Sequence, residues 1–250
     1  MITDPWFYAV AIPAVLLFGI SKGGFGGGLG TAAVPLMALV ISPVQAAAIL
    51  LPILCIMDLV AVWKFRRKWV WPELNVLLPA SLIGILTGTL LFEAMSASVV
   101  RLIVGLVATS FTLHYWINKK RSNNSYFPRS YAVLGGSVAG FTSFVAHSGG
   151  PPISMYLLRR PLDRMDFAAT TVLFFAVVNY VKLVPYAWLG QFDSDNLATS
   201  AALAILAPIG VLIGAWLHKR VSDRFFFSFV YVLLFAVGLK LIYDGVTAYL

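Results

Sequence analysis

The sequence predicts an all-α polytopic membrane protein made of two inverted repeats, each a broken or re-entrant glycine-rich helical hairpin plus three transmembrane helices. Of the 250 residues, 60% are hydrophobic and only 11% are charged, whereas soluble domains are about half apolar and about a quarter charged. Long apolar runs extend from one end of the chain to the other, and each half contains one glycine-rich interruption. These features favour a single membrane domain of the transporter type.

The first interruption, Ser21 to Gly30, contains six glycines in ten residues. Each glycine inside a helix costs ~1 kcal/mol relative to alanine, so we expect the helix to unwind at this stretch. The apolar pieces on either side, Trp6 to Ile20 and Thr31 to Ile41, would be about 22 and about 16 Å long as helices, short of the ~30 Å hydrocarbon core. We therefore predict a hairpin that enters the membrane and returns to its own side.

Three spanning helices are expected after this hairpin, and Ser42 with Pro43 is typical of the start of the first. Their expected ranges are Val44 to Trp63, Pro72 to Phe92 and Ala97 to Ile117. The first half then ends in a basic and polar linker.

The second half repeats this plan around an interruption at Ala146 to Pro152. Tyr131 to Val145 and the short Ile153 to Leu158 flank the interruption. The spanning helices expected after it are Asp166 to Trp188, Asn196 to Leu217 and Phe225 to Tyr243.

The distribution of basic residues predicts the orientation. Fourteen of the 18 Lys and Arg residues lie in four loops, at residues 64–68, 119–129, 159–164 and 219–224, which the positive-inside rule assigns to the cytoplasm. Both termini and the acidic loop Gln191 to Asp195 are then extracytoplasmic, in a multi-pass protein of the cell (inner) membrane. The net charge of +8 follows from this bias, so we expect the lipid bilayer and no nucleic acid as a partner.

Matching glycines support an internal repeat. A shift of 122 residues superposes Gly27 and Gly28 on Gly149 and Gly150. A shift of 126 residues superposes the G-x-x-x-G pair Gly84 and Gly88 on the pair Gly210 and Gly214. Close helix packing alone explains the G-x-x-x-G pairs. The prediction is a first repeat at residues 1–121, a cytoplasmic linker at 122–130 and a second repeat at 131–250, inverted because each half crosses the membrane an odd number of times.

The two interruptions are the expected substrate site, near the membrane midplane. Unwound backbone in a membrane must be buried in protein or line a wet cavity, successive glycine amides can bind an anion, and an intramembrane lysine is a functional hypothesis by default. The expected substrate-binding residues are Ser21, Lys22, Gly23, Gly24, Gly26, Gly27, Gly28, Thr142, Ser143, His147, Ser148, Gly149, Gly150, Asn179 and Lys182.

Some of these residues have an alternative structural role. The hydroxyl groups could bond to their own helices, and Lys182 could extend towards the membrane surface. Asp58, an acid well inside an apolar span, and His147 are the candidates for proton coupling. Cys55 lies in an apolar run and excludes an intramolecular disulfide because it is the only cysteine.

An enzyme is the weaker functional interpretation. The chain has no H-E-x-x-H, G-x-S-x-G or paired-carboxylate signature, and we expect no metal and no cofactor. A passive anion channel is the stronger alternative to a carrier, because two broken segments suit either. Saturable exchange of one substrate for another distinguishes the carrier.

Two segments carry a resemblance to a known family. GFTSFVAHSGGPPISMYLL, from Gly140 to Leu158, and FFAVVNYVKLVPYAWLGQFD, from Phe174 to Asp193, resemble the sulfite exporter TauE/SafE family, within the toluene-sulfonate uptake permease superfamily. The resemblance covers nearly the whole chain.

This resemblance implies a bacterial or archaeal carrier of sulfur-containing anions, such as sulfite, thiosulfate or an organosulfonate like sulfoacetate or taurine. Such carriers usually move the anion outward. For this chain we expect the proton gradient or the membrane potential to drive the transport. Uptake of a sulfur compound is the alternative, since members of the family are described for both directions. The second interruption has fewer glycines than the first and adds Pro151 and Pro152, so the two half-sites need not contribute equally.

Overall fold

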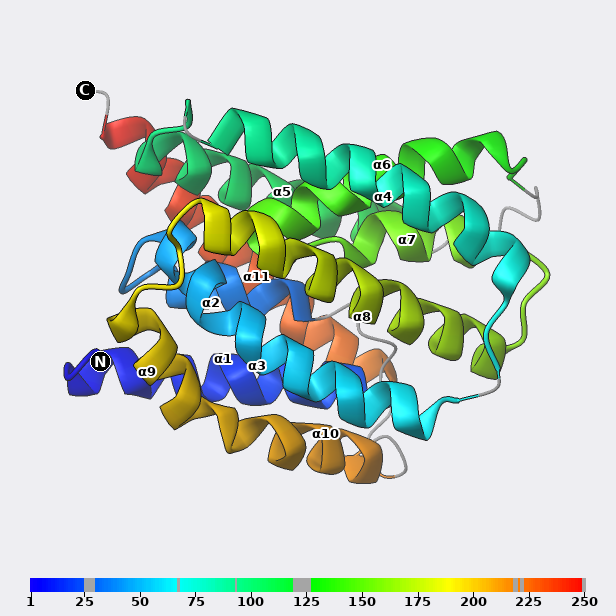
Figure 1. The fold of residues 1–250 in the computed structure, drawn as a ribbon, viewed down its shortest axis with the longest axis horizontal. Helices are drawn as coiled ribbons and strands as arrows, with labels where there is room; N and C mark the ends of the chain where they lie inside the picture. Colours follow the sequence, from blue (N-terminus) through cyan, green and yellow to red (C-terminus); the bar gives the residue numbers. More distant parts are fainter. Residues whose placement is uncertain are drawn as a thin grey trace.

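The computed structural model describes residues 1–24, 30–66, 68–92, 94–118, 127–217, 220 and 223–248. Over this part of the chain the regular structure is helical and no strand occurs, which confirms the all-α prediction. Seven helical segments of the described residues are long and apolar enough to cross a membrane. They lie side by side in one bundle (Figure 1).

The order of elements in the first half follows the predicted plan. Its helices are α1 (Pro5–Gly24), the 3-10 turn η1 (Gly30–Ala32), α2 (Ala33–Met37), α3 (Pro43–Lys64), α4 (Trp71–Phe92) and α5 (Ala97–Asn118). The helix start predicted at Ser42 is confirmed, because its hydroxyl oxygen accepts from the Gln45 amide at 3.1 Å.

The second half contains the corresponding elements. They are α6 (Ser130–Ala146), α7 (Gly150–Leu157), α8 (Arg164–Trp188), α9 (Ser194–Ala204), α10 (Leu206–Leu217) and α11 (Asp223–Thr247). The single helix predicted from Asn196 to Leu217 is thus divided at Ile205. Pro208 explains the division. It has no N–H group to donate to the Ala204 carbonyl, four residues earlier, and its ring clashes with that carbonyl.

The end of α1 contradicts a prediction. The helix does not unwind at Ser21 but continues through Lys22 and Gly23 to Gly24, and 19 of its residues, Pro5–Gly23, form a candidate membrane span. Packing overrides the low helix propensity of glycine: a Cβ on Gly23 would lie 2.1 Å from the Val211 carbonyl oxygen, so its absence lets α1 pack against α10. Residues 25–29, including Gly26, Gly27 and Gly28, lie outside the described residues.

Two helix pairs join the halves through small residues. In the pair of α4 and α6, a Cβ on Gly84 would lie 1.9 Å from the Ser137 carbonyl oxygen, and in the pair of α1 and α10, a Cβ on Gly214 would lie 2.3 Å from that of Ile20. The packing role predicted for the G-x-x-x-G pairs is confirmed. Both pairs are parallel, because contact positions advance in the same direction along the two helices.

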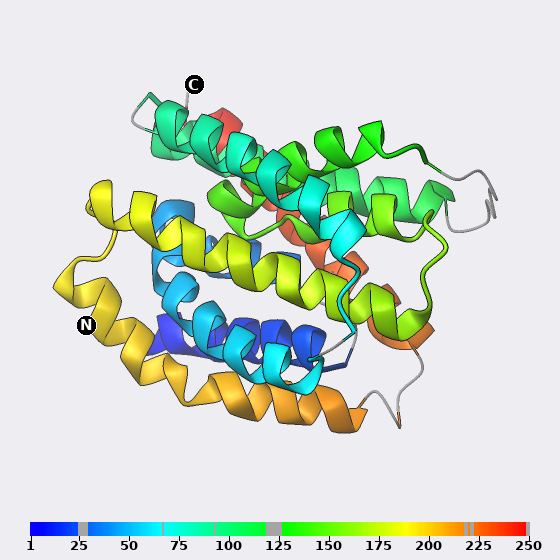
Figure 2. The same cartoon turned by 45° about the vertical axis from the view of Figure 1, so that its right-hand side comes forward.

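The helices α3 and α8 lie between these two pairs. They pack against each other, α3 also contacts α10, and α8 also contacts α4. In both views α8 crosses the middle of the molecule (Figures 1 and 2). Among the described side chains, five polar residues of these two helices are buried inside the bundle: Asp58 of α3, and Thr170, Thr171, Asn179 and Lys182 of α8.

The two ends of the bundle differ in composition. Both chain termini and the α8–α9 connection lie at one end, here called the terminal end (Figure 1). The α3–α4 and α7–α8 connections, with Lys64 and Arg160, lie at the opposite end, here called the basic end (Figure 1). The termini and the basic loops are thus separated, as the charge distribution predicts.

Candidate functional site

The end of α1 and the second interruption border a small cavity inside the bundle, here called the central cavity. Lys22 of α1, Ser143 of α6, Gly150 at the start of α7 and Asn179 of α8 line it together with His147, and its volume is about 10 Å³. Phe18, Leu54 and Phe175 complete its walls. The structure therefore brings together side chains from both halves that the sequence nominated.

His147 makes the bend between α6 and α7. Its backbone is left-handed, with φ 51° and ψ 29°, which is uncommon for a residue other than glycine. The His147 amide donates to the Ser143 carbonyl at 3.0 Å and the Ser148 amide donates to the Thr142 carbonyl at 3.1 Å, so the bend also satisfies the end of α6. Strained backbone of this kind is concentrated at functional sites.

Lys182 points into the bundle, and the alternative that it extends to the membrane surface is wrong. Its side chain is 0% exposed, and its ammonium nitrogen lies 2.9 Å from the Ser143 carbonyl oxygen, 3.0 Å from Ser143 Oγ and 2.7 Å from His147 Nδ1. His147 Nε2 lies 2.9 Å from the Ala47 carbonyl oxygen. Because a carbonyl only accepts, Nε2 carries the imidazole hydrogen and Nδ1 accepts from Lys182. All three partners of this ammonium group are neutral.

The second buried lysine has a different environment. Lys22 forms an ion pair with Asp58, and the two side chains are 5% and 1% exposed. Asn179 donates from Nδ2 to the other carboxylate oxygen of Asp58 at 2.7 Å. Asp58 therefore compensates the charge of Lys22 directly, whereas the hydrogen-bond partners that the described residues offer to Lys182 are neutral groups.

The remaining predicted residues take more structural positions. Thr142 bonds to the Val138 carbonyl of its own helix at 2.8 Å, the structural alternative expected for a hydroxyl. Ser148 donates to the Ala146 carbonyl at 3.1 Å and lies 3.5 Å from that of Thr31 in η1. Ser21 is buried within α1 and Gly24 is its last residue.

The second interruption offers few backbone donors. Gly149 is the N-cap of α7 and Gly150 its first residue, and Pro151 and Pro152, which follow, carry no N–H group. Side chains rather than a row of glycine amides therefore dominate this half of the cavity. Cys55 is buried and unpaired, as expected.

The sequence did not reveal a polar network at the basic end. Glu73, in the first turn of α4, accepts from Arg160 Nε at 2.9 Å and from the Tyr156 hydroxyl at 2.5 Å, and Arg160 also donates to the Phe127 carbonyl at 3.0 Å. This basic-end network ties the C-terminal part of α7 to α4. In the sequence, this network is indicated only by Glu73, an acidic residue close to the basic loop at residues 64–68.

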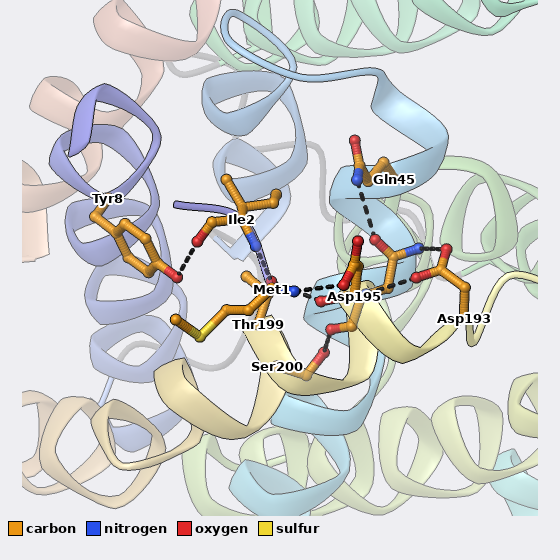
Figure 3. Close-up of polar contacts among 9 residues, drawn as sticks. Met1, Ile2, Tyr8, Gln45, Asp193, Asp195, Thr199 and Ser200 are labelled. Carbon is orange, nitrogen blue, oxygen red and sulfur yellow. Dashed lines mark hydrogen bonds and ion pairs between the residues drawn. The ribbon is translucent and has the colours of Figure 1, made fainter. Parts of the chain in front are cut away.

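A second network lies at the terminal end (Figure 3). Gln45 of α3 donates to Asn196 of α9 at 3.1 Å, Asn196 donates to Asp193 at 2.8 Å, and Ser200 donates to the Ile49 carbonyl at 2.8 Å. The Ile2 amide donates to Thr199 Oγ1 at 3.1 Å, so the N-terminal segment joins the same terminal-end network.

Comparison with known proteins identifies the family. The model of the family described as "Sulfite exporter TauE/SafE" matches residues 11–241. The chain belongs to the sulfite exporter TauE/SafE family. A relative from Cupriavidus necator, named a probable sulfite/organosulfonate exporter TauE, is 24% identical over 177 residues, which cover 69% of this chain and 67% of the relative. No solved structure matches the chain.

Family membership confirms the resemblance noted in the sequence. Members of the TauE/SafE family are transporters of sulfur-containing anions and not enzymes, which agrees with the seven candidate spans found in the described residues. The chain is thus a multi-pass membrane protein of a transporter family.

Proposed function

We propose that this TauE/SafE family protein is a secondary transporter that exports a small sulfur-containing anion, such as sulfite, thiosulfate or an organosulfonate, by alternating access through the central cavity. The observation that carries this proposal is the charge around that cavity. Among the described residues, the side chains of Lys22, Lys182 and Asp58 are buried around it, and Asp58 is paired with Lys22. The partners of Lys182 in this part of the chain are neutral, and an anionic substrate would supply its counter-ion.

The side chains suit an oxyanion. An ammonium group and a hydroxyl can both donate to the same group of oxygens, and charge-assisted bonds of this kind are the stronger ones. Lys182 and Ser143 are bonded to each other at 3.0 Å, and Asn179 lies on the same cavity. In this proposal the anion replaces His147 and Ser143 as the partner of Lys182.

The size of the cavity supports a carrier over a channel. A volume of about 10 Å³ holds about one water molecule, so a sulfur oxyanion can enter only if helices move. The basic-end and terminal-end networks lie at opposite ends of the bundle. In this proposal each network closes the path between the central cavity and one side of the membrane. Breaking them in turn gives alternating access.

The repeats provide a basis for this movement. The first helix of each half packs in parallel against the middle helix of the other half, α1 against α10 and α6 against α4, which is the relation expected of inverted repeats at residues 1–121 and 131–250 with a linker at 122–130. By the positive-inside rule we assign the basic end to the cytoplasm and both termini to the outer face of the inner membrane.

Asp58 is the better of the two candidates for proton coupling. Protonation of Asp58 would remove the negative charge beside Lys22 and make the cavity more attractive to an anion, so proton and anion binding would favour each other. Coupling of this kind carries both in one direction, and an inward proton gradient would drive uptake, so the proposed export relies on the membrane potential. Protonation of His147 would instead place an N–H group against the Lys182 ammonium, 2.7 Å away. An inside-negative membrane potential would favour outward movement of the anion.

Binding to purified protein tests the proposal. Titration calorimetry with sulfite, thiosulfate, taurine, sulfoacetate and sulfate should find at least one ligand whose affinity falls about tenfold or more in Lys182→Met, because the variant loses a buried charge. Lys240→Met is the matched control, since Lys240 is 57% exposed and pairs with Asp244, and its affinity should equal that of the wild type. Unchanged affinity of Lys182→Met for every anion that binds would remove Lys182 from the site.

A further inference from the structure

A second, larger cavity lies beside α7 at the basic end. Its volume is about 300 Å³, within the usual range of small-molecule pockets. Pro151, Ser154, Met155 and Leu158 line one side of it, and their spacing places them on a single face of α7. Gly150, the residue before Pro151, lines the central cavity. The helix α7 is therefore a wall between the two cavities.

The opposite side of the larger cavity is aromatic. Phe111 and Tyr115 of α5 and Tyr231 of α11 line it, and the rings of Tyr115 and Tyr231 are stacked with centroids 4.0 Å apart. Together with Met155 of α7 these rings present a mainly apolar surface. Such a surface binds hydrocarbon groups by removing them from water.

The same cavity has a cationic residue on its wall. Arg159, two residues after the end of α7, lines it with its guanidinium carbon 4.4 Å from the centroid of the Phe127 ring. A guanidinium group stacked on a ring is held in one plane and matches the oxygens of a sulfonate in a bidentate way. The cavity thus combines an anion-binding group with an apolar chamber, and the central cavity lies across α7.

We propose that this cavity is a holding site for organic sulfonates that carry an apolar tail, on the path between the basic end and the central cavity. The sulfonate group bonds to Arg159, and the tail lies among Tyr115, Tyr231 and Met155. Sulfite has no apolar tail, so contact with the apolar wall of the cavity does not increase its affinity. This inference rests on the proposed function and adds to it a second site, at which organosulfonates are selected by the length of their apolar tails.

A chain-length series tests the holding site. The wild-type protein in phosphatidylcholine nanodiscs is titrated with methanesulfonate, propane-1-sulfonate and pentane-1-sulfonate. Affinity should rise about threefold for each added methylene, since each one leaves water for the chamber. Met155→Trp fills the chamber and should abolish the dependence on length. Val184→Trp, at a position that is 73% exposed on α8, is the matched control and should keep it.

The results separate the holding site from the proposed function. Affinity that is independent of tail length, with sulfite still bound, overturns the holding site alone, and so does an unchanged length dependence in Met155→Trp. If no sulfur anion binds at all, both proposals fail. Ser154→Leu, a smaller filling of the same face, serves if Met155→Trp does not fold, and it should reduce the length dependence. Phosphatidylglycerol that co-purifies with the wild type but not with the filled variant would show a lipid site instead and overturn the proposal.

Discussion

Lys22 and Lys182 illustrate at the residue scale how two buried charges can be stabilised differently. Burial of an ion costs several kcal/mol unless partners replace water. Asp58 compensates Lys22 with an opposite charge, whereas Lys182 receives only a carbonyl, a hydroxyl and an imidazole nitrogen. The first arrangement is complete in itself. In the proposed function, the second exchanges its neutral partners for an anion.

Replacing Asp58 should therefore destabilise the protein. In Asp58→Asn the Lys22 ammonium stays buried without its counter-ion, and we expect the free energy of unfolding to fall by about 3–5 kcal/mol. The double variant Lys22→Met with Asp58→Asn removes both charges and should recover most of this loss. Thermal unfolding in detergent measures the effect. Equal melting temperatures for Asp58→Asn and the wild type would show that the ion pair does not stabilise the fold.

Both members of this ion pair were visible in the sequence as rare charges inside apolar segments, but their pairing was not. They are 36 positions apart, and no local pattern relates two helices at that separation. Glu73 and Arg160 are 87 positions apart and each reads as an ordinary loop or helix-end charge. The sequence therefore reveals charged residues that are unfavourable in a membrane, but not the partners that helix packing brings to them.

Close helix contact is the main feature at the element scale. Glycines lie where α4 meets α6 and where α1 meets α10. A Cβ at Gly84, Gly140 or Gly214 would lie within 2.3 Å of a backbone oxygen of the neighbouring helix. Membrane helices associate largely through close van der Waals contact of this kind, because lipid tails are as apolar as the helix surfaces and the hydrophobic effect does not drive the association. The two pairs therefore hold the halves of the protein together.

Gly84→Ala should loosen the α4–α6 pair. The added methyl group would lie 1.9 Å from the Ser137 carbonyl oxygen, so the helices must separate, at a cost of about 1–3 kcal/mol in unfolding free energy. Gly135→Ala, on α6 but facing α7, is the control, because its nearest contacts, Pro152 and Tyr156, would be 3.7 Å away and it should change stability by less than about 1 kcal/mol. Similar melting temperatures for the two variants would contradict this account of the interface.

Helix positions were largely predictable because their signals are local. Apolar runs, the Ser42 cap and the basic residues after the spans all lie in or beside the helix they define. The end of α1 was not predictable in this way, since Gly23 stays helical through its contact with Val211 of α10. The division of α9 from α10 has a local cause in Pro208, which the length of the apolar run does not reveal.

At the scale of the whole molecule, a closed central cavity lies between two polar networks at opposite ends. The basic-end network contains a buried carboxylate, and the terminal-end network is built mostly from amide and hydroxyl groups around Asn196. Alternating access requires that either end can open while the other stays closed. The two networks are the structural elements whose separate removal tests this requirement.

Glu73→Gln should release the basic end. The variant loses the ion pair with Arg160, and local opening around α7 should become easier by about 1–3 kcal/mol. Hydrogen–deuterium exchange read by mass spectrometry should then show uptake in α7 that is about tenfold faster or more. Gln45→Leu at the terminal end is the counterpart and should speed exchange in α9 but not in α7. Equal exchange of α7 in wild type and Glu73→Gln would show that the network does not restrain α7.

Counterflow in proteoliposomes is the most direct test of an anion carrier built around Lys182. Vesicles loaded with the unlabelled anion that binds most tightly are diluted into a trace of the same anion in radiolabelled form. The account predicts transient, saturable accumulation of label by the wild type and a loss of about tenfold or more in Lys182→Met. Flux that rises linearly with concentration, shows no counterflow and is equal in the two proteins would contradict it.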